Sequence, residues 1–325
     1  MKKKKFNVGI IGCGLIGKKR AKALVSNGSL IACSDLDVSR AQYLSKDTDA
    51  KVLSWRDLVS SKEIDIVIIA TNHNSLAEIA RAAASNGKHI LIEKPGAKNV
   101  LELESIESIA KKNSVKIHVG FNHRFHRSLL KAREIIDSGE IGELMFIRGR
   151  YGHGGRIGYE KEWRANPDLS GGGELIDQGT HLIDLTRWFL GDISDVQGLA
   201  CNFFWDMKVE DNAFMTLKTS KNKVAFLHVS CTEWKNLFSF EIYGKLGKLD
   251  LSGLGGSYGQ EKITLYKMLP EMGPPKTISW EYPMADNSWE LEISDFFQNI
   301  RLNKDPTTSL ADAHAVLSTI ESIYK

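Results

Sequence analysis

The chain of 325 residues has no apolar run that approaches the roughly 18 residues of a membrane span, so we expect no membrane segment. Cysteine is scarce, and the four cysteines lie far apart without the spacing of a metal site or a disulfide framework, which suits a reducing cytoplasm. Neither acidic nor basic residues are in large excess, because the net charge is only +3, and this gives no indication of a nucleic-acid partner. The sequence is long enough for two ordinary cores.

A basic run opens the chain, but the apolar core of a signal peptide does not follow it. Lys2–Lys5 leads through Phe6–Ile11 directly into a glycine motif, with no cleavage site. We therefore expect a solvated tail and a cytoplasmic protein.

The first third alternates short apolar runs with amphipathic stretches, which predicts a parallel sheet with helical crossovers. The apolar runs are rich in Val and Ile, as buried strands are. The expected strands are Phe6–Ile11, Ser29–Ser34, Ile64–Ala70, His89–Ile92 and Val115–Val119. The expected helices between them are Gly17–Asn27, Val38–Ser45, Ser75–Asn86 and Val100–Lys112.

Beyond about residue 125 the pattern changes, and from 194 to 282 the chain is a series of strand-like runs with short polar turns, which predicts a mostly antiparallel sheet. The expected strands there are Leu144–Tyr151, Val196–Trp205, Asn212–Thr219, Val224–Cys231, Phe238–Tyr243, Lys248–Leu251 and Ile263–Lys267. The expected helices are Arg127–Ser138, Thr180–Leu190, Asn287–Arg301 and Leu310–Tyr324. We expect an α/β protein with a dinucleotide-binding domain at 1–122 and a substrate-binding and oligomerisation domain at 123–325, whose closing helices can pack back on the first.

The motif Gly12-Cys13-Gly14-Leu15-Ile16-Gly17 follows an apolar strand and opens a helix. This context predicts a dinucleotide site, where glycines allow the close approach of a pyrophosphate to the helix N-terminus. The alternative is a glycine-rich turn without a ligand. Asp35 ends the next strand, at about the offset of an acid that binds the adenosine ribose, and favours NAD over NADP. Arg40 could meet a 2′-phosphate, but as readily lies on the surface.

Another polar strand end follows the apolar run Ile64–Ala70. Thr71, Asn72 and His73 stand where they could face the nicotinamide ribose. For His73 the alternative is an ordinary solvated loop histidine.

The stretch Ser170–His181 combines three glycines with a carboxylate and an imidazole. Gly171–Gly173 could let the backbone come close to a ligand, and Asp177 and His181 would share one face of a helix. Such a pair can transfer protons near neutral pH. The alternative is a helix N-terminus with a structural Asp–His pair. We expect no metal, because no third ligand is evident.

Together these motifs resemble the Gfo/Idh/MocA family of sugar and cyclitol oxidoreductases. The resemblance covers nearly the whole chain in the right order. It rests on Gly12–Gly17, Asp35, Thr71, Glu93-Lys94-Pro95, Gly120–Phe125, and Gly171–Gly173 with Asp177 and His181. The family implies a Rossmann domain, a second α/β domain with an open, largely antiparallel sheet, a nicotinamide cofactor, and dimers or tetramers. The chain departs from the family where Asn72, His73 and Leu76 replace a Pro, an Asn and a His.

The resemblance also assigns roles. Lys94 would stand beside the reacting carbon and stabilise the developing alkoxide, although a surface ion pair with Glu93 is the alternative. His181 is the candidate base, and Asp177 would orient or contact the substrate. Asp184 could share their face or be a solvated surface residue. The candidate cofactor contacts are Gly12, Gly14, Leu15, Ile16, Gly17, Asp35, Arg40, Thr71, Asn72, His73, Glu93 and Lys94.

Asn122 and the loop before the glycines supply further candidates for substrate contacts. That loop contains His153, Arg156, Tyr159, Trp163 and Arg164. An aromatic side chain beside hydroxyl-binding groups suits a sugar ring, whereas arginines could hold a carboxylate or phosphate. We expect Trp163 and Arg164 to contact the substrate away from its reacting carbon; the alternative is a subunit interface.

The sequence therefore predicts an NAD-dependent dehydrogenase that acts on a secondary alcohol of a sugar, cyclitol or sugar derivative. We expect a homodimer or homotetramer without nucleic-acid or membrane partners. The alternatives are an NADP-linked or nucleotide-sugar dehydrogenase of the same fold, and a non-catalytic nicotinamide-sensing protein.

Overall fold

The computed structural model describes residues 5–24, 28–46 and 48–325. Most of the expected basic tail and the end of the helix expected at Gly17–Asn27 lie outside the described residues. The chain forms two compact units. The first comprises Met1–Phe121 and Trp289–His314, and the second comprises Asn122–Ser288 and Ala315–Lys325.

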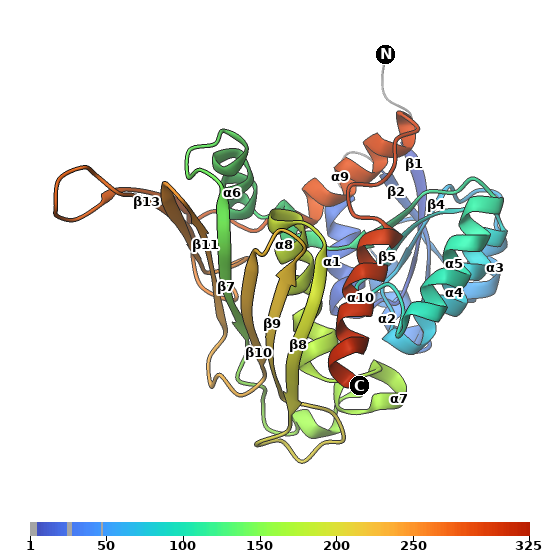
Figure 1. The fold of residues 1–325 in the computed structure, drawn as a ribbon. Coiled ribbons are helices and arrows are strands. Elements are labelled where there is room, and N and C mark those ends of the chain that lie inside the picture. The colour runs from blue at the N-terminus through green and yellow to red at the C-terminus, as the bar shows by residue number, and fades with distance from the viewer. Residues whose placement is uncertain (1–4, 25–27, 47) are drawn as a thin grey trace. The chain divides into compact units, whose positions relative to one another are not determined.

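The first unit contains a parallel sheet of six strands in the order β3-β2-β1-β4-β5-β6 (Figure 1). The strands are β1 (Phe6–Ile11), β2 (Gly28–Ser34), β3 (Lys51–Val52), β4 (Ile66–Ile69), β5 (His89–Glu93) and β6 (Ile117–Gly120). The chain reverses its direction of winding between β1 and β4. In open parallel sheets, ligands bind at this switch point, outside the carboxyl ends of the strands.

Helices cover both faces of this sheet. Figure 1 shows α3, α4 and α5 on one face and α1 and α9 on the other. Phe296 and Phe297 of α9 pack with Val8, Ile10 and the central strands in one apolar core. The helices of this unit are α1 (Leu15–Ala23), α2 (Val38–Ser45), α3 (Trp55–Ser60), α4 (His73–Ser85), α5 (Val100–Lys112) and α9 (Ser288–Arg301).

The second unit contains a sheet of eight strands in the order β14-β13-β12-β11-β7-β10-β9-β8. All its strand pairs are antiparallel except β7 with β10. The strands are β7 (Leu144–Gly152), β8 (Ile193–Cys201), β9 (Asn212–Thr219), β10 (Val224–Ser230), β11 (Leu237–Gly244), β12 (Gly247–Ser252), β13 (Glu261–Lys267) and β14 (Lys276–Tyr282). The expected fold class, a parallel sheet plus a mostly antiparallel one, is confirmed.

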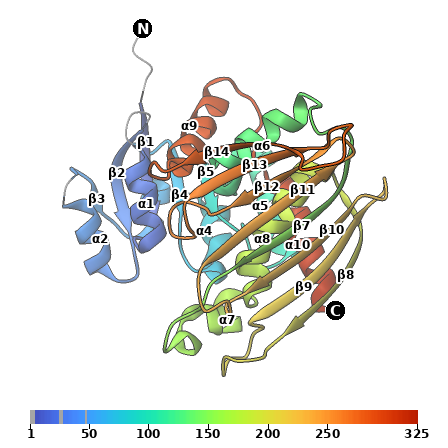
Figure 2. The ribbon, with the colours of Figure 1, turned by 90° about the vertical axis from the view of Figure 1, so that its left-hand side faces the viewer.

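Figure 2 looks onto one face of this sheet, and its helices lie behind the strands. Along β7 the side chains alternate accordingly, because Ile147 is buried whereas Arg148 and Arg150 are exposed. The helices are α6 (Arg127–Asp137), α7 (Pro167–Ser170), a π-helix (Leu175–Gly179), α8 (Thr180–Leu190) and α10 (Leu310–Tyr324), whose last residues from Ala315 on belong to this unit. None of the helices in the described part of the chain is long and apolar enough to cross a membrane.

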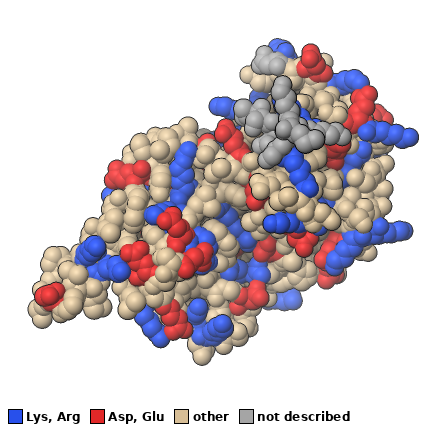
Figure 3. Space-filling view, turned by 90° about the horizontal axis from the view of Figure 1, so that it is seen from above, with Lys and Arg blue, Asp and Glu red and all other residues tan. Residues whose placement is uncertain are grey.

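The sequence did not predict β3, α3, α7 or β14. Strand β14 has no fully buried residue, and β3 is exposed throughout. Such edge strands lack the continuous apolar run by which buried strands are recognised. Acidic and basic side chains are mixed on the face drawn in Figure 3.

Candidate active site

The glycine motif forms a tight turn between β1 and α1. Gly12 has a φ of +94°, and a Cβ there would lie 2.3 Å from the carbonyl oxygen of Ala70. A Cβ on Gly17 would lie 1.9 Å from the carbonyl oxygen of Gly12, so this glycine lets the helix pack against its turn. Gly14 instead faces open space, and no side chain caps the helix that begins after it. An uncapped helix N-terminus beside open space fits a pyrophosphate.

Asp35 closes this turn from the end of β2. Its carboxylate accepts hydrogen bonds from the backbone N–H of Cys13 (2.6 Å) and of Asp37 (2.9 Å). Arg40 forms an ion pair with Asp37 (3.2 Å), and both side chains are about half exposed. The acid is therefore anchored beside the glycine motif, whereas the charge of Arg40 is already balanced. Leu15 is 72% exposed, as a contact with a bound ligand requires.

The ends of β4 and β5 bring the remaining candidates for cofactor contacts to the same edge of the sheet. The hydroxyl of Ser75 donates to Thr71 Oγ1 (2.9 Å), and Asn72 stands at the N-terminus of α4. His73 is the first residue of that helix and is buried, so the interpretation as a solvated loop histidine is wrong. Glu93 ends β5, and Lys94 follows in a half-buried turn whose peptide bond to Pro95 is cis.

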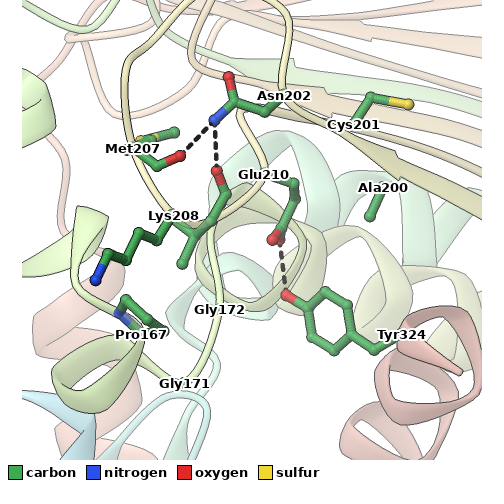
Figure 4. Close-up of a pocket in the computed structure, with 11 residues that line it drawn as sticks. Pro167, Gly171, Gly172, Ala200, Cys201, Asn202, Met207, Lys208, Glu210 and Tyr324 are labelled. Atoms are coloured by element: carbon green, nitrogen blue, oxygen red, sulfur yellow. Dashed lines mark hydrogen bonds between the residues drawn. The ribbon is translucent and has the colours of Figure 1, made fainter.

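In the second unit, two of the three glycines lie directly against other parts of the protein. A Cβ on Gly173 would lie 2.0 Å from the backbone oxygen of Glu210, and one on Gly172 would lie 2.2 Å from the hydroxyl of Tyr324. Gly172 and Gly173 thus approach α10 and the loop that precedes β9, and the approach of a ligand at the three glycines stays a prediction. Glu210 Oε1 accepts the N–H groups of Gly173 and Leu175 (3.0 Å each), and the Tyr324 hydroxyl (2.7 Å; Figure 4).

Glu210 and Tyr324 also line a pocket of about 420 Å³ behind this turn, together with Pro167, Lys208 and Cys201 (Figure 4). Burial raises the pKa of the Glu210 carboxyl, although its hydrogen bonds oppose that effect. Through those bonds Glu210 satisfies two backbone N–H groups at the start of the following helical segment. Hydrogen bonds to Glu210 thus hold the turn that leads to Asp177.

That segment is a π-helix, Leu175–Gly179, which contains Asp177 and runs into α8. The sequence predicted an ordinary helix here, whereas Asp177 lies in the π-helix and His181 lies in α8. Single π-helical turns are rare and occur frequently at functional sites. Both side chains are buried, with exposed fractions of 6% for Asp177 and 4% for His181.

The imidazole of His181 stacks on that of His123, with ring centroids 3.6 Å apart and planes 17° apart. Tyr151 of β7 meets both rings edge-on. Burial raises the pKa of the Tyr151 hydroxyl well above its ordinary value, so this group stays protonated. His123 and Tyr151 were not among the predicted site residues. His123 lies in the Gly120–Phe125 motif, which was the available signal.

Asp177 is held by the loop that precedes the glycines. Its Oδ2 accepts from Arg164 Nε (2.8 Å), and the Arg164 guanidinium lies over the ring of Trp163 (4.7 Å to the centroid). The charge of Asp177 raises the pKa of Arg164 further, so the arginine remains a cation. Arg156 is 75% exposed at its side chain and pairs with Glu162 (2.7 Å).

Glu174 is a second buried carboxylate, and like Asp177 it lies near His153. The sequence did not predict it as a site residue. It accepts from the hydroxyl of Tyr159 (2.9 Å) and lies 3.5 Å from Nε2 of His153. Burial lowers the pKa of His153, but the hydrogen bond and charge of Glu174 outweigh this and leave it above its ordinary value. Glu174 follows the three glycines directly, so its place in the motif could have revealed it.

Asp184 and Asn122 have structural partners. Asp184 is fully buried and forms a double hydrogen bond with Arg124, from Nε to Oδ2 (2.8 Å) and from Nη2 to Oδ1 (2.5 Å). The interpretation of Asp184 as a solvated surface residue is therefore wrong. Asn122 donates from Nδ2 to Ser288 (3.2 Å), and its Oδ1 lies 3.3 Å from Nδ1 of His123. Within the described residues, no group of three or more potential metal ligands occurs.

Two family models match this chain. One describes an oxidoreductase family with an NAD-binding Rossmann fold and matches residues 6–121. The other describes the C-terminal domain of the same Gfo/Idh/MocA family and matches residues 129–250. The chain belongs to the Gfo/Idh/MocA oxidoreductase family. It is thus an NAD(P)-dependent dehydrogenase by family.

Relatives within the Gfo/Idh/MocA family include named dehydrogenases. The chain is 29% identical over 208 residues to levoglucosan dehydrogenase of Pseudarthrobacter phenanthrenivorans, a match that spans 60% of this chain and about half, 53%, of that protein. It is 23% identical over 316 residues to inositol 2-dehydrogenase of Salmonella typhimurium, covering 93% of this chain and 88% of that one. A solved levoglucosan dehydrogenase, in complex with NADH and levoglucosan, shares the fold with a TM-score of 0.90 at 22% identity, covering 99% of this chain and 96% of the other.

Proposed function

We propose that this protein oxidises a secondary alcohol of a neutral sugar or cyclitol with NAD. The observation that carries the proposal is the buried set of Asp177, His181 and Glu174 in the second unit, in a family member that also keeps Lys94 at the end of β5. Two relatives are named levoglucosan dehydrogenase and inositol 2-dehydrogenase. A sensing protein would have no need of this combination.

In the proposed reaction, NAD supplies the acceptor for the hydride that leaves the carbinol carbon. His181 takes the hydroxyl proton through its imidazole, and Lys94 stabilises the alkoxide charge. Arg164 holds Asp177 in place, so that a carboxylate oxygen can accept a hydrogen bond from a neighbouring hydroxyl. Trp163 and Arg164 then define the part of the site away from the reacting carbon.

The charges of the second unit favour a neutral substrate. The guanidinium of Arg164 is already paired with Asp177, and Arg156 is paired with Glu162. Glu174 adds a further buried carboxylate. A carboxylate or phosphate on the substrate would meet these acids while Arg164 and Arg156 are already paired, whereas hydroxyl groups can donate to the acids.

The proposal is tested by screening neutral sugars and inositols for NADH formation, beside uronic acids and sugar phosphates of matched stereochemistry. We expect turnover with a neutral member and a higher kcat/KM for it than for its acidic counterpart. Preferred oxidation of the acid or phosphate would contradict the neutral assignment. NADH binding without turnover of any member would favour the sensing alternative.

We also propose NAD rather than NADP as the preferred cofactor. The carboxylate of Asp35 can accept hydrogen bonds from the ribose hydroxyls and would repel a 2′-phosphate. Asp37 places a second carboxylate nearby and engages Arg40, which removes the most obvious phosphate ligand.

Replacing Asp35 with Ser should weaken NADH binding about 10- to 100-fold, the loss expected for a charged hydrogen bond, and reduce discrimination against NADPH. Fluorescence titration with both cofactors measures the ratio of dissociation constants. Arg40→Ala is the matched control and should leave the preference for NADH intact. Tighter binding of NADPH than NADH by the unaltered protein would show that Arg40 binds the phosphate.

We further propose a cytoplasmic homodimer or homotetramer. Phe226 of β10 is 55% exposed between the buried residues Ala225 and Leu227, and its cross-strand partner on β7, Arg148, is exposed as well. Exposed apolar side chains on one face are typical of subunit contacts.

A further inference from the structure

A fully buried arginine lies in the first unit, where the proposed mechanism does not use it. Arg20 is on α1, three residues after Gly17, and its side chain is 0% exposed. Its Nε donates to Glu93 Oε1 (2.7 Å), and its Nη1 donates to Glu292 Oε2 of α9. One guanidinium thus joins the helix of the glycine motif to the last residue of β5.

A further layer fixes Glu292. Its Oε1 lies 3.3 Å from Nε2 of His118 on β6, and the hydroxyl of Thr308 lies 2.7 Å from the same nitrogen. Thr308 also donates to the backbone oxygen of Val119 (2.6 Å). All these side chains belong to the first unit, so the cluster ties α1, β5, β6 and α9 together around Arg20.

The space around the cluster is filled. The guanidinium lies over the ring of Trp289, 4.5 Å from its centroid. A Cβ on Gly120 would lie 2.8 Å from Arg20 Nη2 and 3.0 Å from Glu93 Oε2. Glycine at position 120 is therefore required for the Arg20–Glu93 pair to fit, and the pair has little freedom to move.

The cluster is a poor way to gain stability. Burial raises the pKa of Glu93, against the charge of Arg20, so ionising this carboxylate has a cost. At Glu292 burial also raises the pKa, but the charge of Arg20 outweighs it and leaves the pKa below its ordinary value. Apolar residues of similar volume often stabilise a core as well as or better than a buried ion cluster. What a cluster of directional bonds supplies instead is a fixed geometry.

The buried cluster holds the side chain of Glu93, and Lys94 is the next residue in the chain. We propose that Arg20 and Glu292 are positioning residues, which hold Glu93 and thereby set the backbone of Lys94 relative to the glycine turn that begins α1. The inference rests on the proposed function, in which Lys94 acts on the substrate hydroxyl. A catalytic group displaced by about 1 Å can lose about 100-fold in rate.

The first test compares Glu292→Gln and Arg20→Lys with the control Glu290→Gln, an exposed residue on the same helix. Glu292→Gln keeps the shape but removes the charge, and Arg20→Lys keeps the charge but loses the planar fork. Both should lower kcat about 10- to 100-fold, with KM and the dissociation constant of NADH within about threefold, because the glycine turn itself is unaltered. The control should keep the original kcat. If Arg20→Lys does not fold, Glu292→Gln decides alone.

A double-mutant cycle separates positioning from general damage. In a Lys94→Ala background, Glu292→Gln should lower kcat no further, because the residue through which it acts is gone. Additive losses would overturn the inference, as would an unchanged kcat in Glu292→Gln. A normal kcat in Lys94→Ala alone would instead overturn the proposed role of Lys94.

A crystal structure of Glu292→Gln provides a readout that needs no substrate. We expect Glu93 and Lys94 to be displaced from their positions in the unaltered protein, while Gly12–Gly17 and the strands keep theirs. Lys94 in an unchanged position would refute the inference even if no substrate were known.

Discussion

Lys94→Ala should lower kcat by about two to four orders of magnitude with a saturating polyol, because the alkoxide that develops during oxidation loses its charge partner. Lys94 follows β5 directly, at the edge of the sheet where α1 begins with an uncapped N-terminus. NADH binding should change much less than kcat, because the glycine turn and Asp35 remain. Steady-state kinetics and fluorescence titration measure the two effects separately.

His181→Ala should cause a loss of the same order through the missing base. Its imidazole is buried against His123, so the variant needs a check of folding by thermal unfolding. His314→Ala, with a side chain 44% exposed, is the matched control and should leave kcat unchanged. A near-normal kcat in His181→Ala would remove this residue from the mechanism.

Breaking the buried pair of Arg124 and Asp184 should cost about 3–5 kcal/mol of the free energy of unfolding, because the remaining charge would lack its partner in an apolar interior. Asp184 is 0% exposed and Arg124 6% exposed, and two hydrogen bonds join them. Denaturant unfolding of Asp184→Ala and of Arg124→Ala should each show this loss of free energy of unfolding.

The double variant Arg124→Leu with Asp184→Leu is the informative control. It removes both charges, so it should be less destabilised than either single variant. Lys245→Ala, which breaks the exposed pair of Lys245 with Glu143, should hardly change the free energy of unfolding. Single variants as stable as the unaltered protein would show that water reaches the pair.

The parallel sheet and the antiparallel sheet could be predicted because apolar residues follow one another in the strands of the first and alternate with other residues in the strands of the second. Buried runs such as Ile66–Ile69 have an apolar residue at every position, whereas β11 alternates buried and half-buried residues. The period of the apolar residues thus distinguishes a covered sheet from one with a polar face. Edge strand β14 offers neither pattern strongly, and it was not predicted.

The candidate site was predictable only where local spacing carries the chemistry. Gly12–Gly17 form the turn after β1, and the carboxylate of Asp35 accepts a hydrogen bond from the N–H of Cys13 within it. Gly173, by contrast, approaches Glu210, which lies 37 residues away, and nothing local signals that contact. The pair of Arg124 with Asp184 joins positions 60 residues apart. The π-helix that contains Asp177 depends on such tertiary support as well, and spacing alone predicts an α-helix there.

The central claim is that this chain takes hydride from a carbinol carbon, and deuterium transfer tests it most directly. The protein is incubated with NAD and inositols or sugars deuterated at their carbinol carbons, and the reduced cofactor is analysed by mass spectrometry. The account predicts NADH that carries one deuterium from the substrate, and almost none of it with Lys94→Ala or His181→Ala. A protein that binds NADH tightly but yields no deuterated cofactor from any of these alcohols would contradict the account.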